Sequence, residues 1–177
     1  MQLLRLFPLV FLCLSSQVFS NPLTVGQPAS VIKLEGDEGG RVTGEPWSSD
    51  EIVKLGKVVS VFYIDPEEKK LNEAVEEAYE KEKFPFEKHG SIAIINMAAA
   101  WYPNSMINNM LQKKQEKFPR TTYVRDIHKK MVKEWGLQDD SVNLTIFDKT
   151  GKVLYTKKGQ MSPEEISDLM KLIRANL

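Results

Sequence analysis

The stretch Lys57-Val-Val-Ser-Val-Phe-Tyr-Ile64, followed directly by Asp65-Pro-Glu-Glu68, decides the fold of this chain. Its unbroken run of β-branched and aromatic residues is typical of a strand buried on both faces, so we expect it at the centre of a sheet. Asp65 can cap a helix, Pro66 suits the first helical position, and the two glutamates suit the positive end of the helix dipole. The sequence therefore predicts a central strand followed by a helix that begins at Asp65.

The expected helix carries an apolar stripe that would pack on a sheet. Its apolar residues recur at helical spacing and are Leu71, Ala74, Val75, Ala78 and Tyr79. Pro85 limits this helix, and the isoleucine-rich segment 90–97 then predicts a second strand. A strand, a helix and a strand in this order predict a right-handed parallel unit.

Later segments continue the alternation of strands and helices. In chain order they are a loop over 98–103, a helix from Asn104 or Ser105, a strand over 120–125, a short helix capped by Asp126 and stopped by Gly136, strands over 142–148 and 152–158 joined by the turn Asp148–Gly151, and a closing helix opened by the capping box Ser162–Glu165. Residues 21–55, rich in glycine and proline, predict only short β pieces.

These elements predict an α/β fold with one central mixed sheet and helices on both faces. The expected strand order is 120–125, 91–97, 57–64, 142–148 and 152–158. We expect near-complete burial of Val59, Val61, Ile94, Leu144 and Ile146.

The first 20 residues are typical of a secretory signal peptide. Arg5 precedes an apolar run from Leu6 to Leu14, and the small residue Ser20 favours cleavage after it. The alternative is a lipoprotein anchored through Cys13, but the bulky Leu12 before it argues against that processing. We therefore expect export to the periplasm, no membrane anchor after cleavage, and a single domain over residues 21–177.

Composition excludes several classes of partner and chemistry. The chain has 24 basic and 24 acidic residues, and loss of Arg5 with the signal would leave 23 basic residues and a net charge of −1. No basic block suits a phosphate backbone, so nucleic acid is not an expected partner. Cys13 is the only cysteine, so cleavage would leave a domain without a thiol.

The order of elements resembles the thioredoxin fold, in which a parallel β-α-β unit precedes an antiparallel hairpin and a terminal helix. Three segments support this resemblance. Val25–Pro28 looks like the start of peroxiredoxin-type members, Gly56–Tyr63 looks like their first central strand, and Leu144–Gly151 looks like their hairpin.

A narrower resemblance covers most of the chain after the signal. Trp135-Gly-Leu with its acidic pair, Ser141–Gly151 and Met161-Ser-Pro-Glu-Glu165 are similar to the YtfJ-like family of exported bacterial proteins. That family carries no settled activity. The resemblance therefore implies a periplasmic location and a thioredoxin-like fold more than it implies a function.

Two departures from working thioredoxins bear on redox chemistry. Asp65-Pro-Glu-Glu68 stands where the resemblance would place the active pair of cysteines, and carboxylates cannot exchange thiols. Val142 stands where redox members keep a cis-proline, and because a cis bond before a non-proline residue costs about 3 kcal/mol, we expect it to be trans. The sequence thus predicts a thioredoxin-like protein without thiol chemistry.

Acidic residues gather where strands of the predicted sheet end. Asp65, Glu67, Glu68, Asp139, Asp140 and Ser141 fall at the carboxyl edge, where open α/β sheets bind ligands. They could form a cation or substrate site, but capping of a helix and decoration of a solvated turn explain them more simply. No calcium-loop spacing is present, and no cofactor is expected.

Trp101 and Tyr102 lie in the loop over 98–103, where two roles are open. We expect them to pack over the sheet edge, and the alternative is that they anchor a partner. Met97, Met106 and Met110 surround this pair, and thioethers suit Cu(I), but Met106 and Met110 share the helical face of Ile107 and Leu111, so we expect core packing.

The two histidines, His89 and His128, lack ligand-spaced companions, and hydrogen bonding or a surface position is expected for each. Two functions from different classes therefore remain. The preferred one is a periplasmic, non-enzymatic module that binds a protein or small ligand. The other is an enzyme that uses the carboxylates of the sheet edge, with or without a metal.

Overall fold

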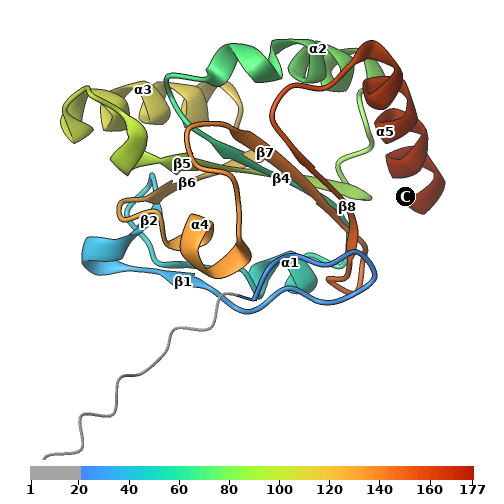
Figure 1. The fold of residues 1–177 in the computed structure, drawn as a ribbon, viewed down its shortest axis with the longest axis horizontal. Coiled ribbons are helices and arrows are strands. Elements are labelled where there is room, and N and C mark those ends of the chain that lie inside the picture. Colours follow the sequence, from blue (N-terminus) through green and yellow to red (C-terminus); the bar gives the residue numbers. More distant parts are fainter. Residues whose placement is uncertain (1–20) are drawn as a thin grey trace, which may run out of the picture.

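The computed structural model describes residues 21–177, so Cys13 and the predicted cleavage site lie outside the described residues. The described chain forms a six-stranded mixed sheet between two layers of other elements (Figure 1). Across the sheet the strands run β2 (Gly39–Arg41), β6 (Thr121–Asp126), β5 (His89–Asn96), β4 (Val58–Ile64), β7 (Val142–Phe147) and β8 (Val153–Lys158). The predicted order of five strands is confirmed, and β2 extends it beyond β6.

Strand β4 is central, as its sequence predicts. It pairs in parallel with β5 and antiparallel with β7, while β5 continues in parallel to β6. All five residues expected in the core are buried, namely Val59, Val61, Ile94, Leu144 and Ile146. The fold is thioredoxin-like and of the α/β class.

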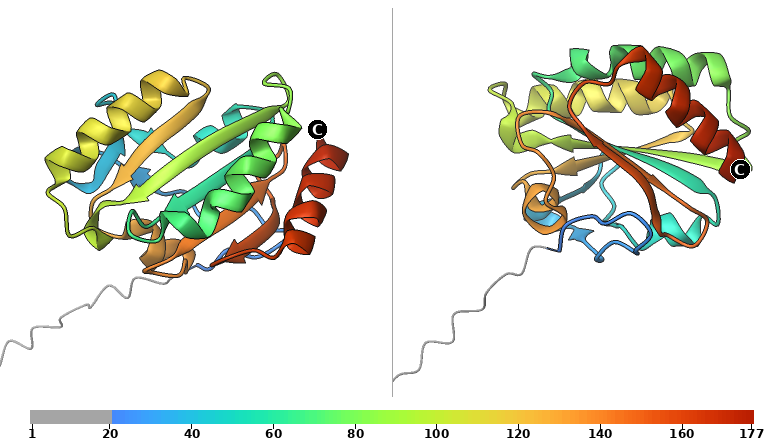
Figure 2. Two further views of the ribbon diagram at one scale, coloured as in Figure 1. Left: turned by 90° about the horizontal axis from the view of Figure 1, so that it is seen from above. Right: turned by 45° about the vertical axis from the view of Figure 1, so that its right-hand side comes forward.

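Helices cover one face of the sheet and a mixed layer covers the other (Figure 2). The upper helices are α2 (Glu73–Glu82), α3 (Asn104–Lys117) and α5 (Pro163–Asn176). The lower layer contains α1 (Glu51–Lys54), α4 (Lys130–Trp135) and the small sheet of β1 (Lys33–Leu34) and β3 (Trp47–Ser48). Side chains of β4 alternate between these layers, with Val59 and Val61 facing the lower core and Phe62 facing the helices of the upper core.

Helix α2 begins later than predicted. A turn follows β4, because Oδ1 of Asp65 accepts a 2.9 Å hydrogen bond from Glu67 N and its carbonyl accepts one from Glu68 N. The 3₁₀ segment Lys69–Asn72 comes next, and the α-helix starts only at Glu73. Asp65 therefore caps a turn rather than the helix, since its short side chain offers the backbone a local alternative to helical bonding.

Helix α3 differs from expectation in which residues it buries. Ile107 and Leu111 pack into the core, but Met106 and Met110 are 53% and 55% exposed. The prediction that these two methionines pack in the core is therefore wrong. The apolar stripe is narrower than the four residues suggest: α3 lies over strands β5 and β6 (Figure 2), and of the four residues only Ile107 and Leu111 pack against them.

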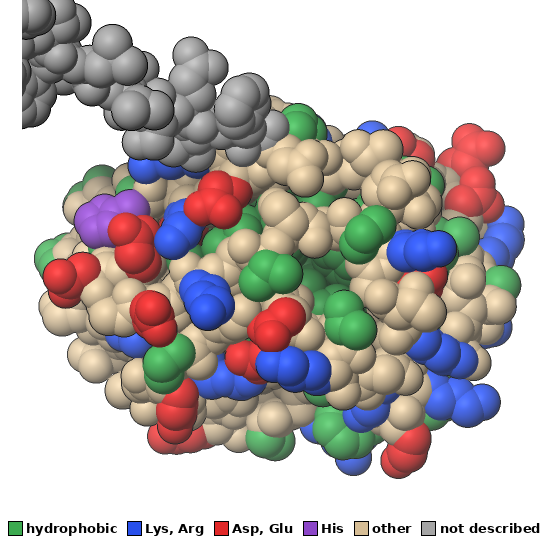
Figure 3. Space-filling view, turned by 90° about the horizontal axis from the view of Figure 1, so that it is seen from below, with side chains coloured by type: hydrophobic (Ala, Val, Ile, Leu, Met, Phe, Trp, Pro, Cys, Tyr) green, Lys and Arg blue, Asp and Glu red, His purple; other side chains and the backbone are tan. Residues whose placement is uncertain are grey.

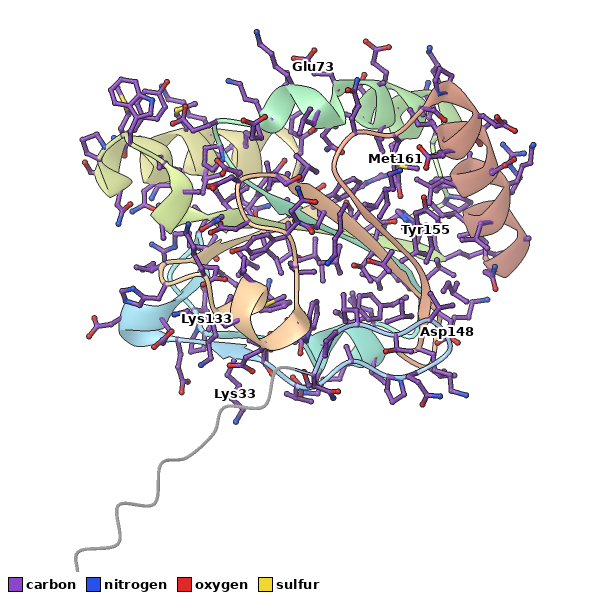
Figure 4. The ribbon with its side chains drawn as sticks, viewed as in Figure 1. Lys33, Glu73, Lys133, Asp148, Tyr155 and Met161 are labelled. Carbon is purple, nitrogen blue, oxygen red and sulfur yellow. The ribbon has the colours of Figure 1, made fainter. Side chains whose placement is uncertain are left out.

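Helix α5 begins as predicted, with both hydrogen bonds of the capping box between Ser162 and Glu165 present. Figure 4 shows Met161 and Tyr155 between the sheet and this helix, whereas Glu73 projects outward from the start of α2. Gly136 ends α4 in the left-handed conformation at φ +64°, also as predicted. Local capping signals therefore fix several boundaries of the fold.

The outer surface of the lower layer differs from the surface that helices α2, α3 and α5 form on the other side. Figure 3 shows hydrophobic side chains gathered around a hollow on it. A cavity of about 170 Å³ there is lined in part by Pro28, Val31, Val53 and Trp135. Within residues 21–177, no helix is long and apolar enough to cross a bilayer.

Candidate functional site

Strand ends bring polar residues together at one edge of the sheet. β4, β5 and β6 run in parallel and end at this edge, where the antiparallel β7 begins, as the pairs Ile64–Ile95, Ile64–Val142 and Asn96–Asp126 show. We call this edge the carboxyl rim. It comprises Asp65–Glu68, Asn96, Trp101, Tyr102, Asp126, Lys129 and Asp139–Ser141.

Asp65 is buried at the start of the carboxyl rim, with only 2% of its surface exposed. Its backbone N–H donates to Ser141 O over 3.1 Å, which joins the end of β4 to the segment before β7. Burial raises the pKa of the Asp65 carboxyl, and the nearby carboxylates of Asp140 and Glu68 raise it further. The acid thus has a buried structural role in the turn.

A second group links β5 to the loop before β7. Asn96 is buried at the end of β5, and its Nδ2 donates to Asp139 Oδ1 over 3.0 Å. The other carboxylate oxygen of Asp139 lies 2.7 Å from Lys129 Nζ. Burial opposes ionisation of Asp139, but the hydrogen bonds and charge of Lys129, the backbone of Asp140 and Asn96 together outweigh it and hold the pKa of Asp139 below its ordinary value.

The remaining predicted residues of this loop differ in exposure. Asp140 is exposed and adopts a left-handed backbone conformation at φ +49°. Ser141 is buried and serves through its carbonyl, and no cis peptide occurs within residues 21–177, so the bond before Val142 is trans as predicted. Asn143 holds the loop from below by exchanging two 2.8 Å hydrogen bonds with the backbone of Gln138.

Tyr63 and Asp126 form a buried pair that the sequence did not single out as a contact. The tyrosine hydroxyl donates to Asp126 Oδ2 over 3.1 Å, and the same carboxylate accepts from the N–H groups of Lys130 and Met131. Asp126 therefore caps α4, as predicted, but from four residues upstream. Because both partners come from different strands, no local spacing could have revealed the pair.

Trp101 and Tyr102 project from the loop between β5 and α3. Trp101 is 75% exposed and Tyr102 37% exposed, and their ring centroids lie 4.1 Å apart. The backbone N–H of Trp101 donates to Glu67 Oε1 over 3.4 Å. The prediction that Trp101 packs over the sheet edge is therefore wrong. The indole extends into solvent, while a hydrogen bond ties the backbone of Trp101 to the turn after β4.

The acids of the carboxyl rim do not assemble into a catalytic pair. Among the described residues, no hydrogen bond joins the carboxyl group of any one of Asp65, Glu68, Asp139 and Asp140 to the carboxyl group of another, and Asp139 is instead neutralised by Lys129. No group of three or more His, Cys, Asp or Glu side chains in residues 21–177 is placed to hold a metal ion. The simpler interpretation, in which these acids organise turns, fits this geometry.

His89 lies at the opposite end of the sheet, where β5 begins. It is buried, and its Nε2 lies 2.8 Å from Ser60 Oγ, which is in turn 2.8 Å from the Tyr79 hydroxyl. Burial lowers the pKa of His89 to about 4, with a smaller contribution from Lys57. This network joins β4, α2 and β5, and hydrogen bonding of His89 is as predicted.

Solved structures with a similar fold include proteins of thiol-disulfide exchange. A putative thiol:disulfide interchange protein DsbE from Chlorobium tepidum matches with a TM-score of 0.57 and 17% identity over 87% of this chain and 98% of that one. A hypothetical protein from Sinorhizobium meliloti matches with a TM-score of 0.60 and 16% identity over 90% of this chain and 87% of that one. At these identities the likeness shows the fold alone.

Sequence relatives are bacterial and uncharacterised. YtfJ of Escherichia coli is 24% identical over 129 residues, which cover 72% of this chain and 70% of that protein. An uncharacterized protein of Haemophilus influenzae is 26% identical over 130 residues, or 73% and 71% of the two chains. The family model described as bacterial protein of unknown function (YtfJ_HI0045) matches residues 30–176. The chain therefore belongs to the YtfJ family of bacterial proteins.

Proposed function

We propose that this protein is an exported, thiol-independent binding module of the periplasm, which holds a protein partner through Trp101 and Tyr102 at the carboxyl rim. The observation that carries the proposal is the 75% exposure of Trp101 beside the stacked ring of Tyr102. Large aromatic side chains are enriched at the centres of protein interfaces, and a solvent-exposed pair of them offers apolar surface that a partner can bury.

The position of the aromatic pair supports this role. It stands above the turn Asp65–Glu68, next to the place where disulfide-exchanging relatives of the fold would carry their cysteines. Glu67 fixes the backbone of Trp101 from that turn, so the indole is presented from an ordered loop. Presentation from an ordered loop lowers the entropic cost of binding.

Thiol independence follows from the position of Cys13. This cysteine lies in the apolar segment 6–14, which we propose is removed on export with cleavage after Ser20. Methionine sulfur cannot form a thiolate, so no other residue of the chain can replace a missing cysteine nucleophile.

The carboxyl rim favours binding over acid–base catalysis. Catalysis of that kind needs a titrating group that is free to exchange a proton with the reacting group of a substrate, whereas Asp139 is paired with Lys129 and Asp65 is engaged by the backbone. The enzymatic alternative therefore has no specific observation in its favour.

The test is the capture of binding partners by protein that the cell has exported by means of the protein's own signal peptide. Affinity-tagged chain is recovered from periplasmic extract and compared with a Trp101→Ala/Tyr102→Ala variant. Val31→Ser is the matched control, because Val31 is also an exposed apolar residue, at 59%, but belongs to the lower layer. We expect a partner that is retained by the parent and the control and lost by the double variant; equal retention by all three would exclude Trp101 and Tyr102 as the anchor.

A further inference from the structure

Methionine exposure in this protein is selective. Of the six methionines in residues 21–177, Met97, Met131, Met161 and Met170 are buried, and only Met106 and Met110 are exposed. Both exceed 50% exposure although neighbouring Ile107 and Leu111 are buried. Methionine normally fills core gaps, so two solvent-facing thioethers on one helix have no packing role to explain them.

The two thioethers are placed to meet at one point. Met106 and Met110 are four residues apart within the continuous helix α3, so their Cβ atoms lie one above the other, about 5–6 Å apart. Each side chain has three rotatable bonds, which lets both sulfur atoms reach a single ion. Trp101 stands just before the same helix and adds an exposed indole face.

Charge and donor type around this place select a soft cation. The stretch Trp101–Gln112 contains no charged residue, no histidine and no cysteine, so it lacks the carboxylates that bind hard cations most strongly. Thioether sulfur is a soft ligand that prefers Cu(I), and an indole face attracts a cation through its quadrupole.

We propose that Met106 and Met110 bind one Cu(I) ion through their sulfur atoms, with the indole of Trp101 over the ion. A third coordination position of the Cu(I) ion is open to exchangeable water or to a ligand atom from another molecule. Binding involves no change in the oxidation state of copper and releases no proton, because thioethers carry none. The inference uses the same end of α3 as the proposed partner surface but does not depend on a protein partner.

The probe is Cu(I) itself, kept reduced with ascorbate under anaerobic conditions and competed against the chromophoric chelator bicinchoninate. The protein is the full chain carrying Cys13→Ser, so that no thiol competes. We expect one Cu(I) per chain and quenching of indole emission that saturates at one equivalent. Failure to withdraw copper from the chelator would overturn the proposal.

Three variants make the assignment specific. Met106→Leu/Met110→Leu keeps size and apolarity but removes both sulfurs, and it should abolish binding; Met97→Leu/Met161→Leu removes two buried sulfurs and should leave binding unchanged. Trp101→Phe should weaken binding about twofold to fivefold. Unchanged stoichiometry in the Met106→Leu/Met110→Leu variant would place the copper elsewhere.

Dependence on pH gives an independent readout. Binding through thioethers should have the same affinity at pH 7.5 and pH 5, because neither sulfur titrates. A tenfold loss at pH 5 would assign the ion to carboxylate or histidine ligands and overturn the proposal. Partner capture and copper binding can also fail separately. If the Trp101→Ala/Tyr102→Ala variant loses partner capture and the parent binds no copper, this inference is overturned and the proposed function stands.

Discussion

The hydroxyl of Tyr63 on β4 donates to the carboxylate of Asp126 at the end of β6, across the intervening strand β5. Because Asp126 also accepts two N–H groups of α4, this contact couples the central strand to a helix of the lower layer. Asp126→Ala should lower the free energy of unfolding by about 3 kcal/mol, since it leaves three donors, two of them buried, without an acceptor. Tyr63→Phe should cost only about 1 kcal/mol.

Urea unfolding of the parent and the two variants checks this ranking. Tyr102→Phe removes an exposed hydroxyl and serves as the matched control, with no expected change. A stability of Asp126→Ala within about 0.5 kcal/mol of the parent would contradict the coupling.

Burial of His89 makes stability depend on pH. The folded pKa of about 4 lies below the unfolded value of about 6.5, so the folded state binds the proton less tightly. This difference in pKa stabilises the folded state fully above pH 6.5. The stabilisation is lost as pH falls toward 4, and the loss amounts to about 2 kcal/mol at pH 5. Urea unfolding at pH 7.5 and pH 5 should show this loss in the parent but not in His89→Gln, and equal losses in both would rule out His89 as the source.

Asp65 should respond in the opposite direction. Its pKa is raised by burial, so ionisation at neutral pH costs free energy in the folded state and acidification toward pH 4 relieves that cost. Asp65→Asn keeps the oxygen that accepts from Glu67 N and removes the charge, so it should be at least as stable as the parent at pH 7. Asp65→Ala loses the acceptor and should be less stable by about 1 kcal/mol. Thermal unfolding distinguishes the two, and a destabilised Asp65→Asn would show that the charge itself is needed.

Gly39 is required for the edge strand β2. Its φ of +131° disfavours other residues, and a Cβ would lie 2.0 Å from the carbonyl oxygen of Arg125 on β6. Gly44 also has a positive φ of +111°, but a Cβ there would meet nothing within 4 Å. Gly44→Ala should therefore cost about 1–2 kcal/mol from backbone strain alone, and Gly39→Ala substantially more.

Hydrogen exchange provides the local measurement for this pair. In Gly39→Ala the amides of β2 and of the β6 residues paired with it should exchange faster, because the clash separates the strands. Equal stability and exchange in the two glycine variants would show that β2 tolerates the added methyl group.

The proposed loss of Cys13 on export gives the last prediction. Protein exported and processed by the cell should give no insulin reduction, disulfide isomerisation or thiol-dependent peroxide turnover above the rate of buffer. A thioredoxin with its cysteine pair is the positive control. Reproducible turnover by a chain shown by mass spectrometry to lack Cys13 would contradict both redox inactivity and the binding role.

The main sheet could be predicted because its signals are local. The apolar run 57–64 and the isoleucines of 90–97 identify buried strands by composition alone, and the helix between them predicts that they form a right-handed parallel unit. Strand β2 could not be predicted, because Gly39-Gly40-Arg41 has no strand pattern and exists as a strand through pairing with β6.

The carboxyl rim was predicted only in part. Asp65, Asp139 and Ser141 were placed at the correct edge, since strand direction determines which ends meet. Asn96 and Lys129 were missed because they act through Asp139, which lies 43 and 10 residues away from them in sequence and outside any local spacing pattern. Exposure of Met106 could not be foreseen, because spacing identifies a helical face but not how much of it a neighbouring layer covers.

The two outermost strands of the main sheet restrict how this protein can associate. Strand β2 is three residues long and contains two glycines, and β8 ends in Lys157 and Lys158, of which the first is paired with Glu165. Short strands and lysines at an edge disfavour the addition of a further strand from another chain. Addition of a partner's strand to the sheet is therefore disfavoured, so a partner must be recognised through its side chains and not through its backbone. For the same reason, the protein at high concentration should not form polymers by pairing of edge strands.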